Sequence, residues 1–272
     1  MVLRRLFVAV LLVSSCHTPA RRHDAAPAQR VVSLLPSFTE ILFAIGAGDQ
    51  TVGRTQWCDY PPEALQVPSV GEGLPPNVEA VLARKPDLVL LYNSGPNVSA
   101  AHQFERVGVR AELIDLNRLE DLGPAAHALG RLTGHEAQGD SLAARMDSIA
   151  SRPLPPPTAS IAFVVWDDPP IVIGRGSYLD QLASQAGARN VFHDIAAPSA
   201  QVSLETIVAR DPHWIAVLSD SGKTPDFARR REWRAVAAVR DGRFLLLAGS
   251  LFGRPGPRSG QAIAELRRML TR

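Results

Sequence analysis

The chain has 272 residues, of which 46% are hydrophobic and 21% are charged, and its formal net charge is +2. This composition excludes an intrinsically disordered chain, and at this length two domains of ordinary size fit better than one. Nucleic-acid binding is disfavoured as well, because the arginine run Arg229-Arg230-Arg231 is best interpreted as a solvated helix face.

The first residues are predicted to be a secretion signal rather than part of the fold. Two arginines precede the apolar stretch Leu6–Val13, which is too short to span a bilayer. The VSSC that follows resembles a bacterial lipobox, so we expect residues 1–15 to be a signal peptide, Cys16 to be lipidated and residues 16–29 to form a tether. The alternative is an ordinary secretory signal with an incidental cysteine.

The next part of the chain alternates predicted strands and helices. The turn at Pro36–Glu40 offers Ser37 or Thr39 as a cap for the helix that follows it. The elements expected here are strand Arg30–Leu35, helix Ile41–Ile45, strand Val52–Arg54, helix Ala100–Val107 and strand Ala111–Ile114.

Two segments of the chain are similar, NVEAVLARKPDLVLL from residue 77 and SLETIVARDPHWIAVL from residue 203, and they suggest two similar lobes. Each predicts a helix capped by Asn77 or Ser203, a proline that ends the helix, and a continuous apolar run typical of a buried parallel strand. Glu79 and Glu205 occupy matching positions in the first helical turn, where the helix dipole favours negative charge.

Between the two copies, residues 119–151 have a helical pattern that breaks at Thr133-Gly134 and ends at RPLPPP. We therefore expect an N-terminal lobe at 30–134, a connecting helix with its proline-rich end at 135–157, and a C-terminal lobe at 158–272. The other elements expected in the second lobe are strand Ser160–Val165, helix Tyr178–Ala186, helix Pro225–Val239, strand Arg243–Leu247 and helix Gly260–Leu270.

The predicted fold class is α/β, with two Rossmann-like lobes joined by a single long helix and a ligand cleft between them. Ligands of such folds bind at the carboxyl ends of strands and between domains. The loops expected there carry six of the sixteen aromatic residues, which suits a large, flat, partly polar ligand. These aromatic residues are Phe38, Trp57, Tyr60, Tyr92, Trp166 and Phe252.

No motif in the sequence supports an enzyme. Walker A and Gly-x-Ser-x-Gly motifs are absent, and the adjacent Asp167-Asp168 is interpreted as a polar rim of the cleft rather than an acid/base dyad. Cys58 is interpreted as a buried thiol rather than a nucleophile. The histidines are scattered outside the aromatic loops, so we expect no metal site and no cofactor.

The chain resembles the substrate-binding proteins of ABC importers that belong to the helical-backbone superfamily. The resemblance rests on RVVSLLPSFTEILFAIGAGDQTVGRTQWCDYPPEA, the two glutamate-bearing repeats, GSYLDQLASQAGARNVF and SLFGRPGPR, and covers nearly all of the mature chain. The DYPP loop and LFGRPGPR point to the cobalamin-binding branch, whereas haem and iron-siderophore binders belong to the same superfamily. The resemblance implies a monomeric, lipid-anchored receptor on the periplasmic or cell-envelope face that delivers a corrinoid to a permease dimer.

The resemblance also implies roles for individual residues. It places a ligand-stacking aromatic at Trp57, near Tyr60, and a second cleft aromatic at Tyr92; Trp166 is expected to join them from the other lobe. It implies permease docking through Glu79 and Glu205. The expected contact loop of the second lobe comprises Ser250, Leu251, Phe252, Gly253 and Arg254.

The sequence departs from the family's cobalamin binders at three points. The GEGLPP loop lacks the expected tryptophan, Ser250 stands where an acid is expected, and the disulfide of the second lobe is absent.

Overall fold

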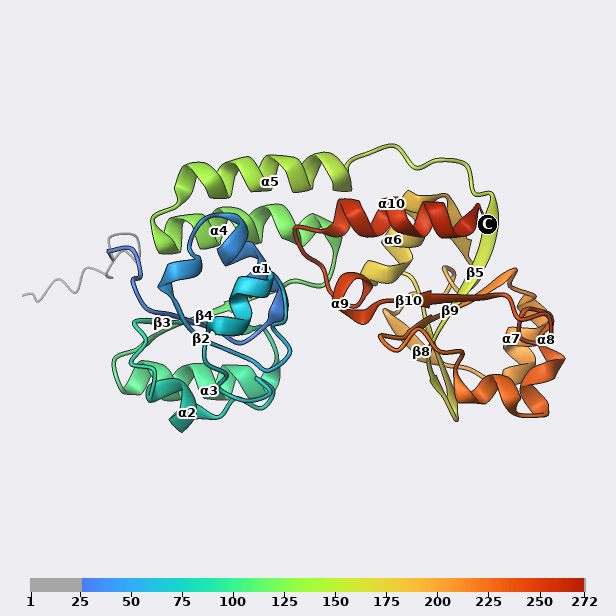
Figure 1. The fold of residues 1–272 in the computed structure, drawn as a ribbon, viewed down its shortest axis with the longest axis horizontal. Helices are drawn as coiled ribbons and strands as arrows, with labels where there is room; N and C mark the ends of the chain where they lie inside the picture. The colour runs from blue at the N-terminus through green and yellow to red at the C-terminus, as the bar shows by residue number, and fades with distance from the viewer. Residues whose placement is uncertain (1–25, 272) are drawn as a thin grey trace, which may run out of the picture.

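The computed structural model describes residues 26–271, which form two lobes lying side by side (Figure 1). The expected signal peptide and Cys16 lie outside these residues. Within residues 26–271, no helix is both long and apolar enough to cross a bilayer.

The N-terminal lobe contains a parallel sheet with the strand order β2-β1-β3-β4. Its central strand β3, Leu88–Tyr92, is fully buried from Leu88 to Leu91, as expected for a parallel strand covered on both faces. The other strands are β1 Val31–Ser33, β2 Thr51–Arg54 and β4 Arg110–Ile114.

Helices cover both faces of this sheet because alternate residues of β3 point in opposite directions. Leu88 and Leu90 pack with one set of helices, and Val89 and Leu91 pack with the other. The first set is α1 Pro36–Ala44 and α4 Leu122–Thr133; the second set is α2 Val78–Leu82 and α3 Gly95–Arg106. Short 3₁₀ turns occur at η1 Gly48–Gln50, η2 Pro62–Gln66 and η3 Leu119–Asp121.

The predicted start of α1 is wrong. The helix begins at Pro36, so Ser37 and Thr39 lie inside it, and neither side chain caps it. Proline favours the first helical position because its φ angle is already helical and its missing N–H is not needed there. The Thr39 hydroxyl instead donates to the Ser33 hydroxyl of β1 at 2.8 Å.

Both copies of the repeat form the predicted cap, helix and strand. The side chain of Asn77 accepts from the Ala80 N–H at 3.0 Å, and that of Ser203 accepts from the Thr206 N–H at 3.3 Å. The second copy forms α7 Leu204–Arg210 and β9 Trp214–Leu218. In each copy the residue before the proline has a left-handed backbone, with φ of 51° at Lys85 and 42° at Asp211.

The chain passes from the first lobe to the second through α5, Glu136–Ala150, and the extended segment that follows it (Figure 1). Gly134 ends α4 with a φ of 76°, which turns α5 back against α4. Gly130 and Gly139 let the two helices approach closely, since a Cβ on either would meet the other's Cα within 3.0 Å.

The second lobe contains a mixed sheet with the strand order β10-β9-β5-β6-β8, and β7 also pairs with β5. β5 Ala159–Asp167, β7 Ala188–Asn190, β9 and β10 Phe244–Leu247 pair in parallel. β6 Pro170–Ile173 and β8 Ser199–Gln201 extend the sheet antiparallel. No strand was expected from the sequence at β6, β7 or β8.

The helices of the second lobe include one clear error of prediction. Helix α6 Tyr178–Ala186 has the predicted bounds, and α10 Ser259–Leu270 begins one residue early. The predicted helix Pro225–Val239 is instead η4 Asp226–Arg229, η5 Glu232–Ala235 and α8 Ala237–Arg240. This irregular path lets Phe227 and Trp233 stack in the core with their ring centroids 4.2 Å apart. The run Arg229–Arg231 is therefore not one helix face.

One hydrophobic core is continuous between the two lobes. It joins Phe38 and Ile41 of the first lobe to Phe163 and Leu182 of the second, and α5 contributes Leu142. The lobes therefore share buried apolar contacts in addition to the covalent connection.

The close packing of α4 on α5 predicts that Gly139→Ala destabilises the protein. The new Cβ would lie 2.8 Å from the Ala126 carbonyl oxygen, which is backbone and cannot move aside easily. We expect a loss of about 1–3 kcal/mol in the free energy of unfolding, larger than the gain of about 1 kcal/mol in helix propensity. Urea denaturation measures the change. The control is Gly95→Ala, where the added Cβ meets no atom within 4 Å; equal stability of the two variants would contradict the packing argument.

Candidate ligand cleft

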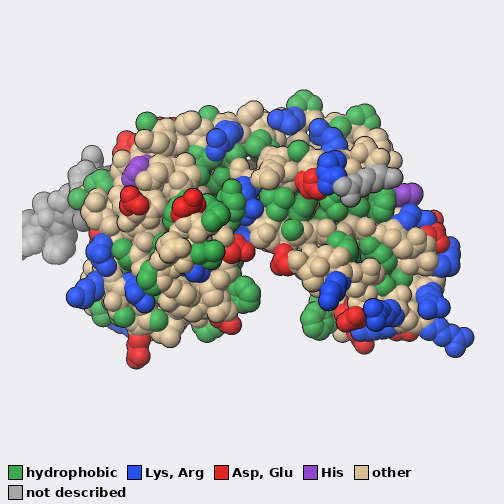
Figure 2. Space-filling model, viewed as in Figure 1, with side chains coloured by type: hydrophobic (Ala, Val, Ile, Leu, Met, Phe, Trp, Pro, Cys, Tyr) green, Lys and Arg blue, Asp and Glu red, His purple; other side chains and the backbone are tan. Residues whose placement is uncertain are grey.

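A deep hollow separates the two lobes on one side of the molecule (Figure 2). The carboxyl ends of the parallel strands in α/β folds are the usual places for ligands. In this protein, β2 and β3 of the first lobe and β5, β9 and β10 of the second lead into the loops that the sequence analysis assigned to a cleft. The site therefore draws its residues from both lobes.

Aromatic side chains on these loops are unusually exposed. Trp57 follows β2 and is 58% exposed, while Trp166 lies near the end of β5 and is 59% exposed. The Trp166 indole N–H donates to the Asp168 carbonyl at 2.8 Å, which fixes the ring from one edge. Tyr60 is 39% exposed. Exposed indole rings leave large apolar surfaces in water, and such surfaces commonly mark binding sites.

Tyr92 ends β3 and is partly buried. Its hydroxyl donates to the Asn117 side-chain oxygen at 2.6 Å. The ring is therefore held at the end of the central strand of the first lobe, with its hydroxyl already engaged.

Two of the six aromatics predicted to face a ligand lie in the core instead. Phe38 is buried because it lies within α1 rather than in a loop. Phe252 is only 2% exposed because it ends the short helix α9, Gly249–Phe252, and packs into the shared core. Leu251 and Ser250 of α9 are partly buried, and Gly253 is exposed.

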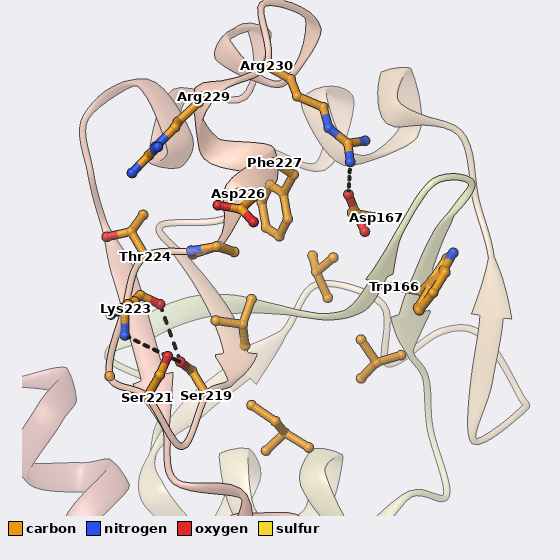
Figure 3. Close-up of a pocket in the computed structure, with 16 residues that line it drawn as sticks. Trp166, Asp167, Ser219, Ser221, Lys223, Thr224, Asp226, Phe227, Arg229 and Arg230 are labelled. Carbon is orange, nitrogen blue, oxygen red and sulfur yellow. Dashed lines mark hydrogen bonds and ion pairs between the residues drawn. The ribbon is translucent and has the colours of Figure 1, made fainter.

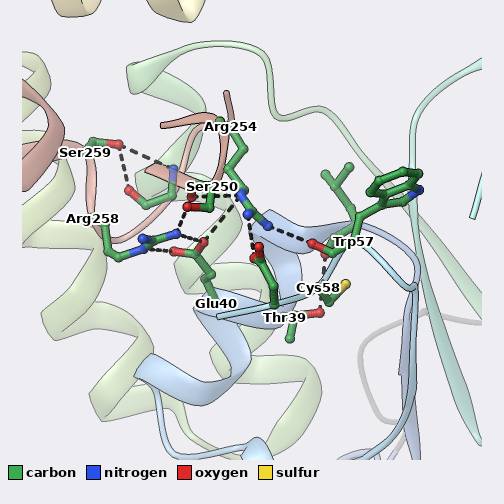
Figure 4. A network of polar contacts seen from close by, with 12 residues as sticks. Thr39, Glu40, Trp57, Cys58, Ser250, Arg254, Arg258 and Ser259 are labelled. Carbon is green, nitrogen blue, oxygen red and sulfur yellow. Dashed lines mark hydrogen bonds and ion pairs between the residues drawn. The ribbon is translucent and has the colours of Figure 1, made fainter. Parts of the chain in front are cut away.

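A buried carboxylate ties the lobes together at the cleft (Figure 4). Glu40 of α1 is only 3% exposed, and its side chain accepts from the Arg258 Nε at 2.9 Å and Nη2 at 2.6 Å. The Arg258 guanidinium lies 3.8 Å from the centroid of the Tyr60 ring. Arg258 belongs to the second lobe, whereas Glu40 and Tyr60 belong to the first, so these contacts cross between lobes.

Arg254 makes a second set of contacts across the lobes. Its Nη2 lies 2.6 Å from Asp59 Oδ1, and its Nη1 donates to the Trp57 carbonyl at 3.0 Å. Its Nε lies 3.7 Å from Glu40 Oε1 and donates to the Ser250 carbonyl. Arg254 therefore anchors the loop that presents Trp57, while the indole itself projects away from the charged groups (Figure 4).

The charges in this cluster stabilise one another. Burial alone would lower the pKa of Arg258, but hydrogen bonding and the charge of Glu40 outweigh it, so the pKa is raised above its usual value. Nearby, burial raises the pKa of Tyr178 to about 12, and its hydroxyl donates to Ser259 at 3.0 Å. The Arg258 guanidinium therefore stays charged and the Tyr178 phenol stays neutral at physiological pH.

The second lobe also contains a pocket that was not expected from the sequence. It lies at the carboxyl ends of β5 and β9 and has a volume of about 840 Å³ (Figure 3). Its wall includes the loop between β9 and η4, residues 219–225, which was not assigned to the cleft. A sequence signal existed: this loop follows the strand of the second repeat, just as the Tyr92 loop follows the strand of the first.

The two repeat glutamates lie away from these groups, at the starts of separate helices. Glu79 and Glu205 are both exposed, in the first turns of α2 and α7. Hydrogen bonds from its own backbone N–H and from the Ser203 side chain lower the pKa of Glu205. Glu205 is therefore ionised at neutral pH.

Other chemistry is not evident in the described part of the chain. Residues 26–271 contain no group of three or more His, Cys, Asp or Glu side chains that could hold a metal ion. Cys58 is buried, as predicted, with its sulfur 3.1 Å from the Thr55 hydroxyl. Arg230 binds Asp167 at 2.6 Å, so the adjacent acids Asp167-Asp168 face an arginine rather than each other.

Comparison with known proteins gives a consistent result. A family described as periplasmic binding protein matches residues 31–250. A vitamin B12-binding protein from Pectobacterium carotovorum is 29% identical over 251 residues, covering 89% of this chain and 88% of the relative. The periplasmic vitamin B12 binding protein BtuF of Vibrio cholerae superposes with a TM-score of 0.72 at 25% identity, covering 90% of this chain and 97% of that one.

Haem-binding proteins have the same fold. The periplasmic haem-binding protein RhuT from Roseiflexus sp. RS-1, in apo form, superposes with a TM-score of 0.77 at 26% identity. The superposition covers 89% of this chain and 97% of that one.

The cluster around Glu40 predicts that Glu40→Gln strongly destabilises the protein, because two partly buried guanidinium groups would lose the buried carboxylate that they share. We expect a loss of about 3–5 kcal/mol in the free energy of unfolding, measured by urea denaturation. Glu105→Gln is the control, since Glu105 forms an exposed pair with His102 that is worth about 0–1 kcal/mol. A similar small loss in both variants would show that the Glu40 cluster does not hold the lobes together.

Proposed function

Because the chain belongs to the periplasmic binding protein family, we propose that it captures a corrinoid of the cobalamin type between its lobes and delivers it to an ABC importer. As a member of this family the chain is a periplasmic transport component rather than an enzyme. The corrinoid is its cargo and not a cofactor.

The observation that carries the proposal is the pair of exposed tryptophans, one on each lobe. A corrin ring is large, flat and edged with polar amides, so it suits two indole surfaces with polar groups between them. The named relatives that bind vitamin B12 support this choice of ligand. We assign ligand contacts to Trp57 and Trp166, together with Tyr60 and Tyr92.

The loop around α9 is proposed to contact the edge of the ligand. Ser250, Leu251 and Gly253 are partly or fully accessible, whereas buried Phe252 supports the loop from below. Arg254 is proposed to contact the amides of the ligand through its guanidinium. The same guanidinium binds Asp59 and so fixes the loop that carries Trp57.

Haem is the second candidate ligand, supported by the likeness to RhuT. A tyrosine could bind haem iron, and Tyr60 and Tyr92 both lie on the predicted cleft loops. In this structure, however, the Tyr92 hydroxyl already donates to Asn117, and this contact favours the corrinoid.

Delivery is proposed to use the exposed helix starts of the two lobes. Glu79 and Glu205 stand at matching places in two similar lobes, so each could pair with a basic side chain of one subunit of a permease dimer. Two such contacts would make docking bivalent. The proposed lipid at Cys16, which rests on the VSSC motif, would keep a monomeric receptor near that permease.

Trp57→Ala is predicted to weaken cyanocobalamin binding by about 1–3 kcal/mol, or roughly 5–150-fold in Kd, through loss of aromatic contact area. Calorimetric titration measures the change. Leu154→Ala removes a side chain that is also exposed, at 62%, but lies on the segment connecting the lobes, and should leave Kd unchanged. Equal affinity in parent and Trp57→Ala would remove this residue from the site.

The double variant Glu79→Arg with Glu205→Arg is predicted to abolish uptake through the importer while cyanocobalamin affinity stays normal. Loss of one partner of a desolvated ion pair in an interface costs about 2–5 kcal/mol of binding free energy. Reversing the charge of both glutamates removes both contacts of the bivalent complex. Uptake into cells and Kd of the purified protein are measured separately. Uptake at the parent rate, or loss of ligand affinity, would refute the docking role.

A further inference from the structure

The pocket in the second lobe has an excess of positive charge that the contacts described so far leave unused. Five charged side chains line it, Asp167, Lys223, Asp226, Arg229 and Arg230. Arg230 is neutralised by Asp167 at 2.6 Å. Within residues 26–271, neither Lys223 nor Arg229 forms an ion pair with an acidic side chain, and Asp226 offsets only one of these two charges.

The loop that carries Lys223 also presents hydroxyl groups. The Lys223 N–H donates to the Ser221 hydroxyl at 3.3 Å, and the Ser219 hydroxyl donates to the Lys223 carbonyl at 3.3 Å, so these contacts shape the loop and leave the Thr224 hydroxyl and the Lys223 ammonium available. Figure 3 shows Lys223, Thr224 and Arg229 along the same side of the pocket. A hydroxyl, an ammonium and a guanidinium that line one side of a pocket are donors that can bind an anionic oxygen group.

The opposite wall of the pocket is apolar. Leu218, Phe227 and Trp166 line it, and the indole of Trp166 is well exposed. The pocket therefore combines a cationic side with an apolar side, which suits an aromatic ring that carries a phosphate.

The pocket is connected to the cleft rather than remote from it. Asp220, in the same loop, accepts from the Gly249 N–H at 2.6 Å. Gly249 begins α9, the helix of the proposed contact loop. A ligand lying against α9 and Trp166 would therefore lie beside the loop that carries Lys223.

We propose that this pocket is a subsite for the phosphodiester and base of the cobalamin nucleotide loop, bound through Lys223 and Arg229. The inference rests on the proposed function. Cobalamin carries this anionic loop on one edge of its ring, whereas cobinamide has the same ring without the phosphate and base. The subsite thus lets the protein prefer complete cobalamin over its incomplete relative.

The test compares cyanocobalamin with dicyanocobinamide in calorimetric titrations of the full chain. The parent should bind cyanocobalamin about 10-fold or more tightly than dicyanocobinamide, as expected for a charge-assisted contact. Lys223→Ala with Arg229→Ala should remove most of this preference by weakening cyanocobalamin alone. Arg231→Ala is the matched control, because Arg231 is exposed but does not line the pocket.

The outcomes separate this inference from the function on which it rests. If the parent binds both corrinoids equally, or the double variant weakens both by the same factor, the subsite is refuted and the corrinoid function stands. If the parent binds neither corrinoid, the function and the subsite both fail. The same variants are also titrated with haem, which carries carboxylates. If the double variant binds haem more weakly but binds cyanocobalamin as the parent does, the phosphodiester assignment is refuted.

Discussion

The buried carboxylate of Glu40 is the interaction on which the cleft depends. It lies in the first lobe but is bound by Arg258, and approached by Arg254, from the segment between β10 and α10. A charge this deeply buried is costly unless it is paired, so the lobes cannot separate at this point without exposing or orphaning it. Arg254 extends the same cluster to the loop of Trp57.

Rigidity at this point has a consequence for binding. A hydrophobic core continuous between the lobes and the ion cluster at the cleft both fix the position of one lobe relative to the other. Gln181 of the second lobe adds a contact by donating to Glu120 of the first at 2.8 Å. A cleft already formed before the ligand arrives avoids the cost of ordering it on binding. Under the proposed function, affinity then depends on the exposed aromatic surfaces and not on closure of the lobes.

The sequence predicted those parts of the fold that depend on local chemistry. Asn77 and Ser203 cap their helices because short polar side chains satisfy free N–H groups at any helix start, and β3 is a buried strand because its residues are apolar without a break. The helix predicted after Pro225 is wrong because the apolar residues of this segment have helical spacing. In the structure the segment instead forms 3₁₀ turns, which let Phe227 and Trp233 pack against each other. Tertiary packing overrode the local pattern.

The cleft was predictable only in part for a similar reason. The exposure of Trp57 and Trp166 follows from their places just after and near the end of strands, but no pattern in the sequence pairs Glu40 with Arg258, because they meet only once both lobes are folded. The central claim is that this preformed cleft binds a corrinoid. Calorimetric titration of the purified protein with cyanocobalamin and with haem tests it most directly. Saturable one-to-one binding of cyanocobalamin, tighter than that of haem, is the predicted result; saturation by haem without binding of cyanocobalamin would contradict it.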